Sequence, residues 1–116
     1  MTTTCKIEID SLTKKSVYTS ADILPQNEGG QDSLFRSFRR IKAGNVAGDY
    51  SPTLVVAFIV DTNGIIIGER ILTGNIEIGQ QILNVIKSFK WKPAKCQGKN
   101  IDMLYKFPVI IEVREE

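Results

Sequence analysis

The chain has no histidine, and among its 116 residues only two are cysteine and one is tryptophan. Histidine is the commonest general base and zinc ligand in proteins, so its absence excludes Ser-His and Cys-His catalytic pairs and the usual zinc sites. The sequence also shows no phosphate-cradling glycine loop and no nucleophile elbow. These absences predict a protein that is not an enzyme, with no catalytic residue, no metal and no cofactor.

The two cysteines are Cys5 and Cys96. Small secreted domains that are held together by disulfides normally contain four cysteines or more. The sequence therefore favours two free thiols, with a single disulfide as the second interpretation and a metal or catalytic role as the last.

Long apolar runs and strong charge are missing as well. The longest purely apolar stretch, residues 54–60, is far too short to span a bilayer, and the first residues lack the apolar core of a secretory signal. The net charge of +2 gives no reason to expect nucleic-acid or membrane binding. As it stands, the chain predicts a cytoplasmic protein, or one whose targeting segment has been removed.

One local cluster of charge is basic and consists of Arg36, Arg39, Arg40 and Lys42. A nucleic-acid-binding domain would carry more basic residues with aromatic residues beside them. We therefore expect a solvated helix face with cations near the negative end of the helix dipole.

What is present is sufficient for one domain, since 42% of the residues are hydrophobic. Residues 1–24 are predicted to be an N-terminal segment of short extended stretches, and residues 25–116 the domain proper. Gly29-Gly30 breaks the chain, after which Asp32 or Ser33 is expected to cap a helix. The apolar stripe of this helix consists of Leu34, Phe35, Phe38 and Ile41, and Gly44 is expected to end it.

A hairpin is predicted next, with strands over residues 53–60 and 65–72. Asn63-Gly64 tolerates the positive φ of a tight turn, and Asp61 is expected to bond the turn backbone rather than act as a ligand or base. Both strands are apolar on both faces. We expect one face to meet the helices and the other to be covered by the N-terminal segment or by a second subunit.

The remaining residues predict a helix and a last strand. Asn75 is the expected N-cap of the helix, and Trp91 is expected to close the core over its C-terminal end. Apolar and polar residues then alternate along residues 101–107, as in a half-buried strand. Pro108 cannot donate a ladder hydrogen bond, which favours a strand at the edge of the sheet.

These motifs, in this order, resemble the C-terminal domain of TonB-type energy transducers. The residues that carry the resemblance are Phe58-Ile59-Val60-Asp61, Gly64, Trp91-Lys92-Pro93-Ala94, Gly98-Lys99 and Phe107-Pro108-Val109. The match covers residues 53–113 and loosely 25–42, and it leaves residues 1–24 without a counterpart. Complete transducers also carry an N-terminal membrane anchor and a Pro-rich spacer, which this sequence does not show.

The resemblance implies a non-enzymatic periplasmic domain that binds a peptide of a TonB-dependent outer-membrane transporter. The peptide would add as a strand beside the last strand of the domain, through backbone groups that an edge strand leaves unpaired. The implied contact residues are Ile101, Asp102, Met103, Leu104, Tyr105, Lys106 and Phe107. Backbone groups would dominate the affinity, with the side chains of Asp102, Leu104 and Lys106 tuning it.

The expected fold is α+β: a three-stranded antiparallel sheet with two helices on one face and an extra N-terminal extended segment. A crossover has to place the last strand beside the first of the three, at the edge of the sheet. Two other functions stay open. One is a structural homodimer that pairs through the same edge or through the second apolar face, and the other is a small-molecule binder with a pocket under the N-terminal segment.

Overall fold

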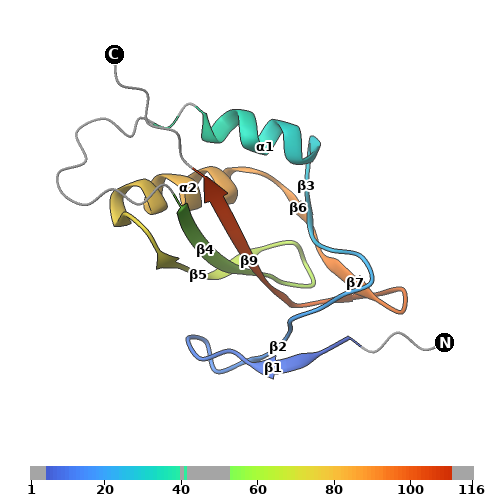
Figure 1. The fold of residues 1–116 in the computed structure, drawn as a ribbon. Helices are drawn as coiled ribbons and strands as arrows, with labels where there is room; N and C mark the ends of the chain where they lie inside the picture. Colours follow the sequence, from blue (N-terminus) through green and yellow to red (C-terminus); the bar gives the residue numbers. More distant parts are fainter. Residues whose placement is uncertain (1–4, 40, 42–52, 111–116) are drawn as a thin grey trace, which may run out of the picture.

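The computed structural model describes residues 5–39, 41 and 53–110 (Figure 1). Arg40, Lys42 and the helix end predicted at Gly44 lie outside the described residues. The elements in chain order are β1 (Ile7–Ile9), β2 (Ser16–Tyr18), β3 (Gln26–Asn27), α1 (Gly30–Phe38), β4 (Thr53–Val60), β5 (Ile66–Thr73), α2 (Ile76–Ser88), β6 (Trp91–Lys92), β7 (Ala94–Cys96), β8 (Lys99–Ile101) and β9 (Met103–Ile110). The fold class is α+β, as predicted.

The main sheet differs from the prediction in its size. Within the described residues it has five strands in the order β1-β2-β9-β4-β5, and β3-β6 and β7-β8 form two further two-stranded sheets. The predicted three-stranded sheet therefore has to be corrected. The reason is that the N-terminal segment forms a β1–β2 hairpin, which joins the sheet beside β9.

The predicted crossover is present, because β9 lies beside β4. The two strands are antiparallel over eight residue pairs, from Thr53 opposite Ile110 to Val60 opposite Met103. The predicted position at the edge of the sheet is wrong, however, because β2 lies on the other side of β9 in the strand order. That contact consists of a single parallel pair, Tyr18 with Met103, so β2 covers only the beginning of β9.

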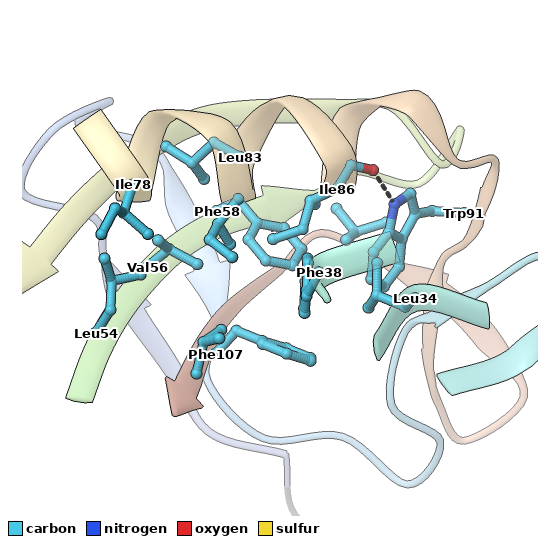
Figure 2. Close-up of a cluster of buried hydrophobic side chains, with 13 residues drawn as sticks. Leu34, Phe38, Leu54, Val56, Phe58, Ile78, Leu83, Ile86, Trp91 and Phe107 are labelled. Carbon is cyan, nitrogen blue, oxygen red and sulfur yellow. Dashed lines mark hydrogen bonds between the residues drawn. The ribbon is translucent and has the colours of Figure 1, made fainter. Parts of the chain in front are cut away.

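Both helices lie on the same side of the main sheet (Figure 1). Alternate side chains of β4 (Leu54, Val56, Phe58 and Val60) form one core with Phe107 and Val109 of β9 and with buried residues of α1 and α2 (Figure 2). Burying one such side chain stabilises a fold by about 2 kcal/mol, whereas an exposed ion pair such as Lys87–Glu69 contributes about 0.5 kcal/mol. The apolar core therefore determines how the helices sit on the sheet.

The first helix begins earlier than predicted. Its N-cap is Gly29 and makes no side-chain cap hydrogen bond, so neither Asp32 nor Ser33 is the cap. The hydroxyl of Ser33 instead donates to the carbonyl of Gly29 at 3.1 Å. Of the predicted stripe, Leu34 and Phe38 are buried and Ile41 packs against the core beyond the helix end, but Phe35 is 41% exposed.

The second helix and its flanks follow the prediction. The side-chain oxygen of Asn75 accepts the N–H of Ile78 at 3.0 Å, as an N-cap does. Trp91 is buried after the helix, and its indole N–H donates to the carbonyl of Ile86 at 2.8 Å, so it closes the core over the helix C-terminus (Figure 2). In the hairpin turn, the Asp61 carboxylate accepts the N–H groups of Asn63 and Ile65, both at 2.9 Å.

The second face of the sheet is covered by the N-terminal hairpin, on the side away from the helices (Figure 1). The turn between β1 and β2 reaches β5, where Asp10 pairs with Arg70 at 2.8 Å and the Thr13 side chain lies against Gly68. Ala57 and Ile59, which alternate with the helix-facing residues of β4, are both buried. The sequence predicted that this face is covered either by the N-terminal segment or by a second subunit, and the structure shows the N-terminal segment there.

The cysteines form a disulfide, which corrects the expectation of two free thiols. Cys5 and Cys96 are bonded across a sequence separation of 91 residues, with their Cα atoms 6.4 Å apart. The bond ties the beginning of the N-terminal hairpin to the β7–β8 hairpin. No helix of the described residues combines the length and the apolar character that crossing a membrane requires.

Candidate peptide-binding edge

The predicted contact residues divide into two groups. Ile101 belongs to β8, where it is buried and pairs with Ala94 of β7. Asp102 lies between β8 and β9, and its carboxylate accepts the N–H of Thr62 at 2.8 Å. Met103 is buried and has a neighbour on each side, Tyr18 and Val60. These first three positions are therefore occupied by contacts within the chain.

The other four positions lie inside β9. Leu104, Tyr105, Lys106 and Phe107 are the partners of Ile59, Phe58, Ala57 and Val56 of β4, respectively. On the side away from β4, no strand of the described residues pairs with β9 beyond Met103. We call this side of β9, from Leu104 to Val109, the free edge.

The direction of the backbone groups along β9 follows from one hydrogen bond. The N–H of Tyr18 donates to the carbonyl of Asp102 at 2.9 Å, so the Asp102 carbonyl points toward β2. Backbone groups of every second residue in a strand point to the same edge. Those of Leu104, Lys106 and Pro108 therefore point to the free edge, while those of Tyr105 and Phe107 point to β4.

This alternation explains how Pro108 fits within a paired strand. Proline has no N–H, and a proline that pointed to β4 would remove a bond from the ladder. At Pro108 the missing donor faces the free edge instead, so the β4–β9 ladder stays complete. Along the free edge, the N–H of Lys106 and the carbonyls of Leu104, Lys106 and Pro108 are the groups that a further strand would meet.

An aromatic row borders the free edge on the helix side. The ring of Phe107 lies 5.6 Å from that of Tyr105 and 5.9 Å from that of Phe35 on α1, measured between centroids. Burial raises the pKa of the Tyr105 hydroxyl, as expected for a half-covered phenol. Phe35 remains 41% exposed, so an apolar surface is available beside the strand.

The charge beside the free edge is positive. Lys106 of β9 and Arg39 just after α1 are both exposed, and neither forms an ion pair with a described residue. Arg39 follows Phe35 by four positions and so lies on the same side of the helix. The free edge thus combines backbone groups that no described strand pairs, an exposed aromatic ring and cations.

A depression of about 440 Å³ lies at the beginning of the free edge. It is lined by β2, the hairpin turn at Thr62 and the β7–β8 hairpin, and Asp102 and Ile101 contribute to its wall. This is where the structure places a pocket under the N-terminal segment. Its lining mixes polar and apolar surface, and no buried polar side-chain atom of the described residues lacks a hydrogen-bond partner, so nothing there points to a particular small molecule.

Two features of this region were not predicted from the sequence. The closure of the first part of β9 by Tyr18 depends on a parallel contact between residues 85 positions apart, which no local pattern reveals. The exposure of Phe35 depends on which side of α1 meets the sheet. The open side of β9 beyond Met103 did have a signal in the sequence. Pro108 has no N–H to donate, and Leu104 and Lys106 stand an even number of residues before it, so their backbone groups point to the same side of the strand.

No family model, no curated protein and no solved structure matches this chain. The resemblance to the C-terminal domains of TonB-type transducers therefore rests on the ordered motifs of residues 53–113 alone, and it remains a prediction.

Proposed function

We propose that this protein binds an extended peptide, which adds as a strand to the free edge of β9. The observation that carries the proposal is the pairing of β9: eight residue pairs with β4 on one side and one pair with β2 on the other. An exposed strand edge is a template for another strand, because its N–H and carbonyl groups are already aligned. Main-chain hydrogen bonds supply the affinity in this mode of binding.

The contact region that we propose is shorter than the one implied by the family resemblance. Ile101 and Met103 are buried and paired within the chain, so the guest strand would begin at Leu104. Lys106 is central, because it offers both an N–H and a carbonyl to the free edge. Phe35, whose ring packs against that of the buried Phe107, would cover apolar side chains of the guest on the helix side.

At the level of physiology, we propose a periplasmic domain of TonB type whose guest is a peptide of an outer-membrane transporter. The ordered motifs support this proposal. So does the Cys5–Cys96 disulfide, because stable disulfides form in oxidising compartments such as the periplasm and are rare in the cytosol.

The proposal can be tested with two substitutions at one position. Lys106→Pro removes the N–H that faces the free edge and leaves the ladder to β4 intact, whereas Lys106→Ala removes the side chain and keeps the N–H. The probes are ten-residue peptides from the periplasmic N-terminal segments of TonB-dependent transporters, titrated while amide signals of residues 104–109 are followed. We expect wild type and Lys106→Ala to bind, and Lys106→Pro to bind at least tenfold more weakly.

The result that would overturn the proposal is binding that Lys106→Pro leaves unchanged, or amide shifts that avoid residues 104–109. The same edge could also pair with a second copy of the chain. Sedimentation of the peptide-free protein at micromolar concentration separates the two cases, since a receptor for peptides sediments as a monomer and an edge-paired dimer does not.

A further inference from the structure

The disulfide lies beside a carboxylate. The sulfur atoms of Cys5 and Cys96 and a side-chain oxygen of Asp22 all lie within 4.8 Å of one another. The three residues come from distant parts of the chain: Cys5 precedes β1, Asp22 follows β2, and Cys96 ends β7. The fold thus gathers two sulfurs and an oxygen at one point.

Asp22 is held in this position by two hydrogen bonds. Its backbone N–H donates to the carbonyl of Lys95 at 3.0 Å, and its carboxylate accepts the N–H of Gln97 at 2.8 Å. A hydrogen bond from outside the site that orients a ligand carboxylate is a usual feature of metal centres. The carboxylate therefore keeps its place whether or not the two sulfurs are bonded to each other.

We propose that reduction of the disulfide turns Cys5, Cys96 and Asp22 into a site for a thiophilic divalent metal ion of the zinc class. Zinc binds thiolate sulfur at about 2.3 Å and carboxylate oxygen at about 2.1 Å, which puts neighbouring ligand atoms about 3.5 Å apart. The Asp22 oxygen already lies within 4.8 Å of both sulfurs, and after reduction the two sulfurs, which are bonded to each other in the oxidised protein, would move apart to that spacing. Water would fill the fourth position of the tetrahedron.

The chemistry balances with a dithiol as the reductant. One of its thiolates attacks the Cys5–Cys96 bond, and its second thiol resolves the mixed disulfide, so the reductant leaves as a cyclic disulfide and the protein gains two thiols. The metal then displaces the two thiol protons, since only thiolates ligate it.

Solvent and a metal ion can reach the site, because Cys5 and Cys96 are partly exposed and Asp22 is exposed. Cys96 and Gln97 also line the depression of about 440 Å³ beside β2. This inference is independent of peptide binding, because the three residues lie outside the free edge of β9.

The test uses cobalt(II) as a spectroscopic probe and zinc as the competitor. The whole chain is reduced anaerobically with a phosphine, which is oxidised to the phosphine oxide, and is then titrated with cobalt. We expect thiolate-to-cobalt absorption and tetrahedral visible bands in the reduced wild type, both lost on addition of zinc. The oxidised wild type and Cys5→Ser/Cys96→Ser should show neither.

Asp22→Asn tests the third ligand. Its disulfide is intact before reduction, so the amide spectrum of the oxidised variant establishes that it is folded. We expect reduced Asp22→Asn to bind cobalt at least tenfold more weakly than wild type, and Glu77→Gln, which changes an exposed carboxylate at the start of α2, to bind as wild type does. Absence of thiolate-to-cobalt absorption in the reduced wild type, or equal affinity of Asp22→Asn and wild type, would overturn the proposal.

Discussion

The carboxylate of Asp10 and the guanidinium of Arg70, sixty residues apart in the chain, are joined by contacts of 2.8 and 2.9 Å. Asp10 is 3% exposed and also accepts the backbone N–H and the hydroxyl of Thr13. This ion pair fixes the turn of the N-terminal hairpin to β5. The hairpin thereby covers the second face of the sheet, and its last residue, Tyr18, determines where the free edge of β9 begins.

Removing one partner of this pair should destabilise the protein substantially. Asp10→Ala leaves the guanidinium of Arg70 without its partner and should lower the free energy of unfolding by about 3 kcal/mol, as for other buried pairs. Asp10→Ala/Arg70→Ala should recover part of the loss in a double-mutant cycle, measured by urea denaturation. The control is the exposed Glu69–Lys87 pair, for which Glu69→Ala should cost about 0.5 kcal/mol. Equal effects at the two pairs would contradict the role given to Asp10.

The same contacts predict a dependence of stability on pH. Burial alone would raise the pKa of Asp10, but the hydrogen bonds from Thr13 and Arg70 outweigh it, so the pKa lies below its ordinary value of 3.8. A group whose pKa is lower in the folded state stabilises fully above its unfolded value, and this stabilisation is lost as the pH falls through the folded value. Unfolding free energies should therefore fall as the pH drops below about 4. Asp10→Asn should show a shallower decline over that range, and a slope as steep as that of wild type would exclude Asp10 as the cause.

The hairpin turn before β5 should tolerate no side chain at Gly64. Gly64 has φ of 78°, and a Cβ there would collide with the backbone carbonyl of Trp91. Gly98 has the same φ of 78° but nothing within 4 Å of an added Cβ, so it is a matched control. Gly98→Ala should cost about 1 kcal/mol for the left-handed conformation alone, and Gly64→Ala about 3 kcal/mol because the clash adds to it. Thermal or urea unfolding of both variants checks this, and equal losses would show that the turn relaxes without cost.

Elements fixed by their own sequence could be predicted closely. The strand over residues 53–60, the Asp61–Gly64 turn and the helix after Asn75 each contain their defining signals within a few residues, and β4, the turn and α2 follow them. The position of β9 beside β4 could also be predicted. The helix after β5 acts as a crossover connection, and such a connection places the last strand beside the first strand of the hairpin. The start of α1 could not, since its cap is Gly29 and makes no side-chain hydrogen bond.

Contacts between distant residues account for the rest. The Cys5–Cys96 bond, the Asp10–Arg70 pair and the contact of Tyr18 with Met103 each join the first 18 residues to segments at least sixty positions away. Nothing in the local pattern around Cys5 or Asp10 indicates its partner. For the candidate site, alternation alone could place Lys106 and Phe107 on the last strand, but it could not show that β2 lies beside that strand at Met103.

Hydrogen exchange at Lys106 and Phe107 tests the open edge and its guest most directly. In the free protein, the Phe107 N–H points to β4 and should exchange slowly, while the Lys106 N–H points to the free edge and should exchange quickly. Saturation with a transporter-derived peptide should slow exchange at Lys106 at least tenfold and leave Phe107 nearly unchanged. A Lys106 amide that is already protected without peptide, or one that a bound peptide fails to protect, would contradict strand addition at β9.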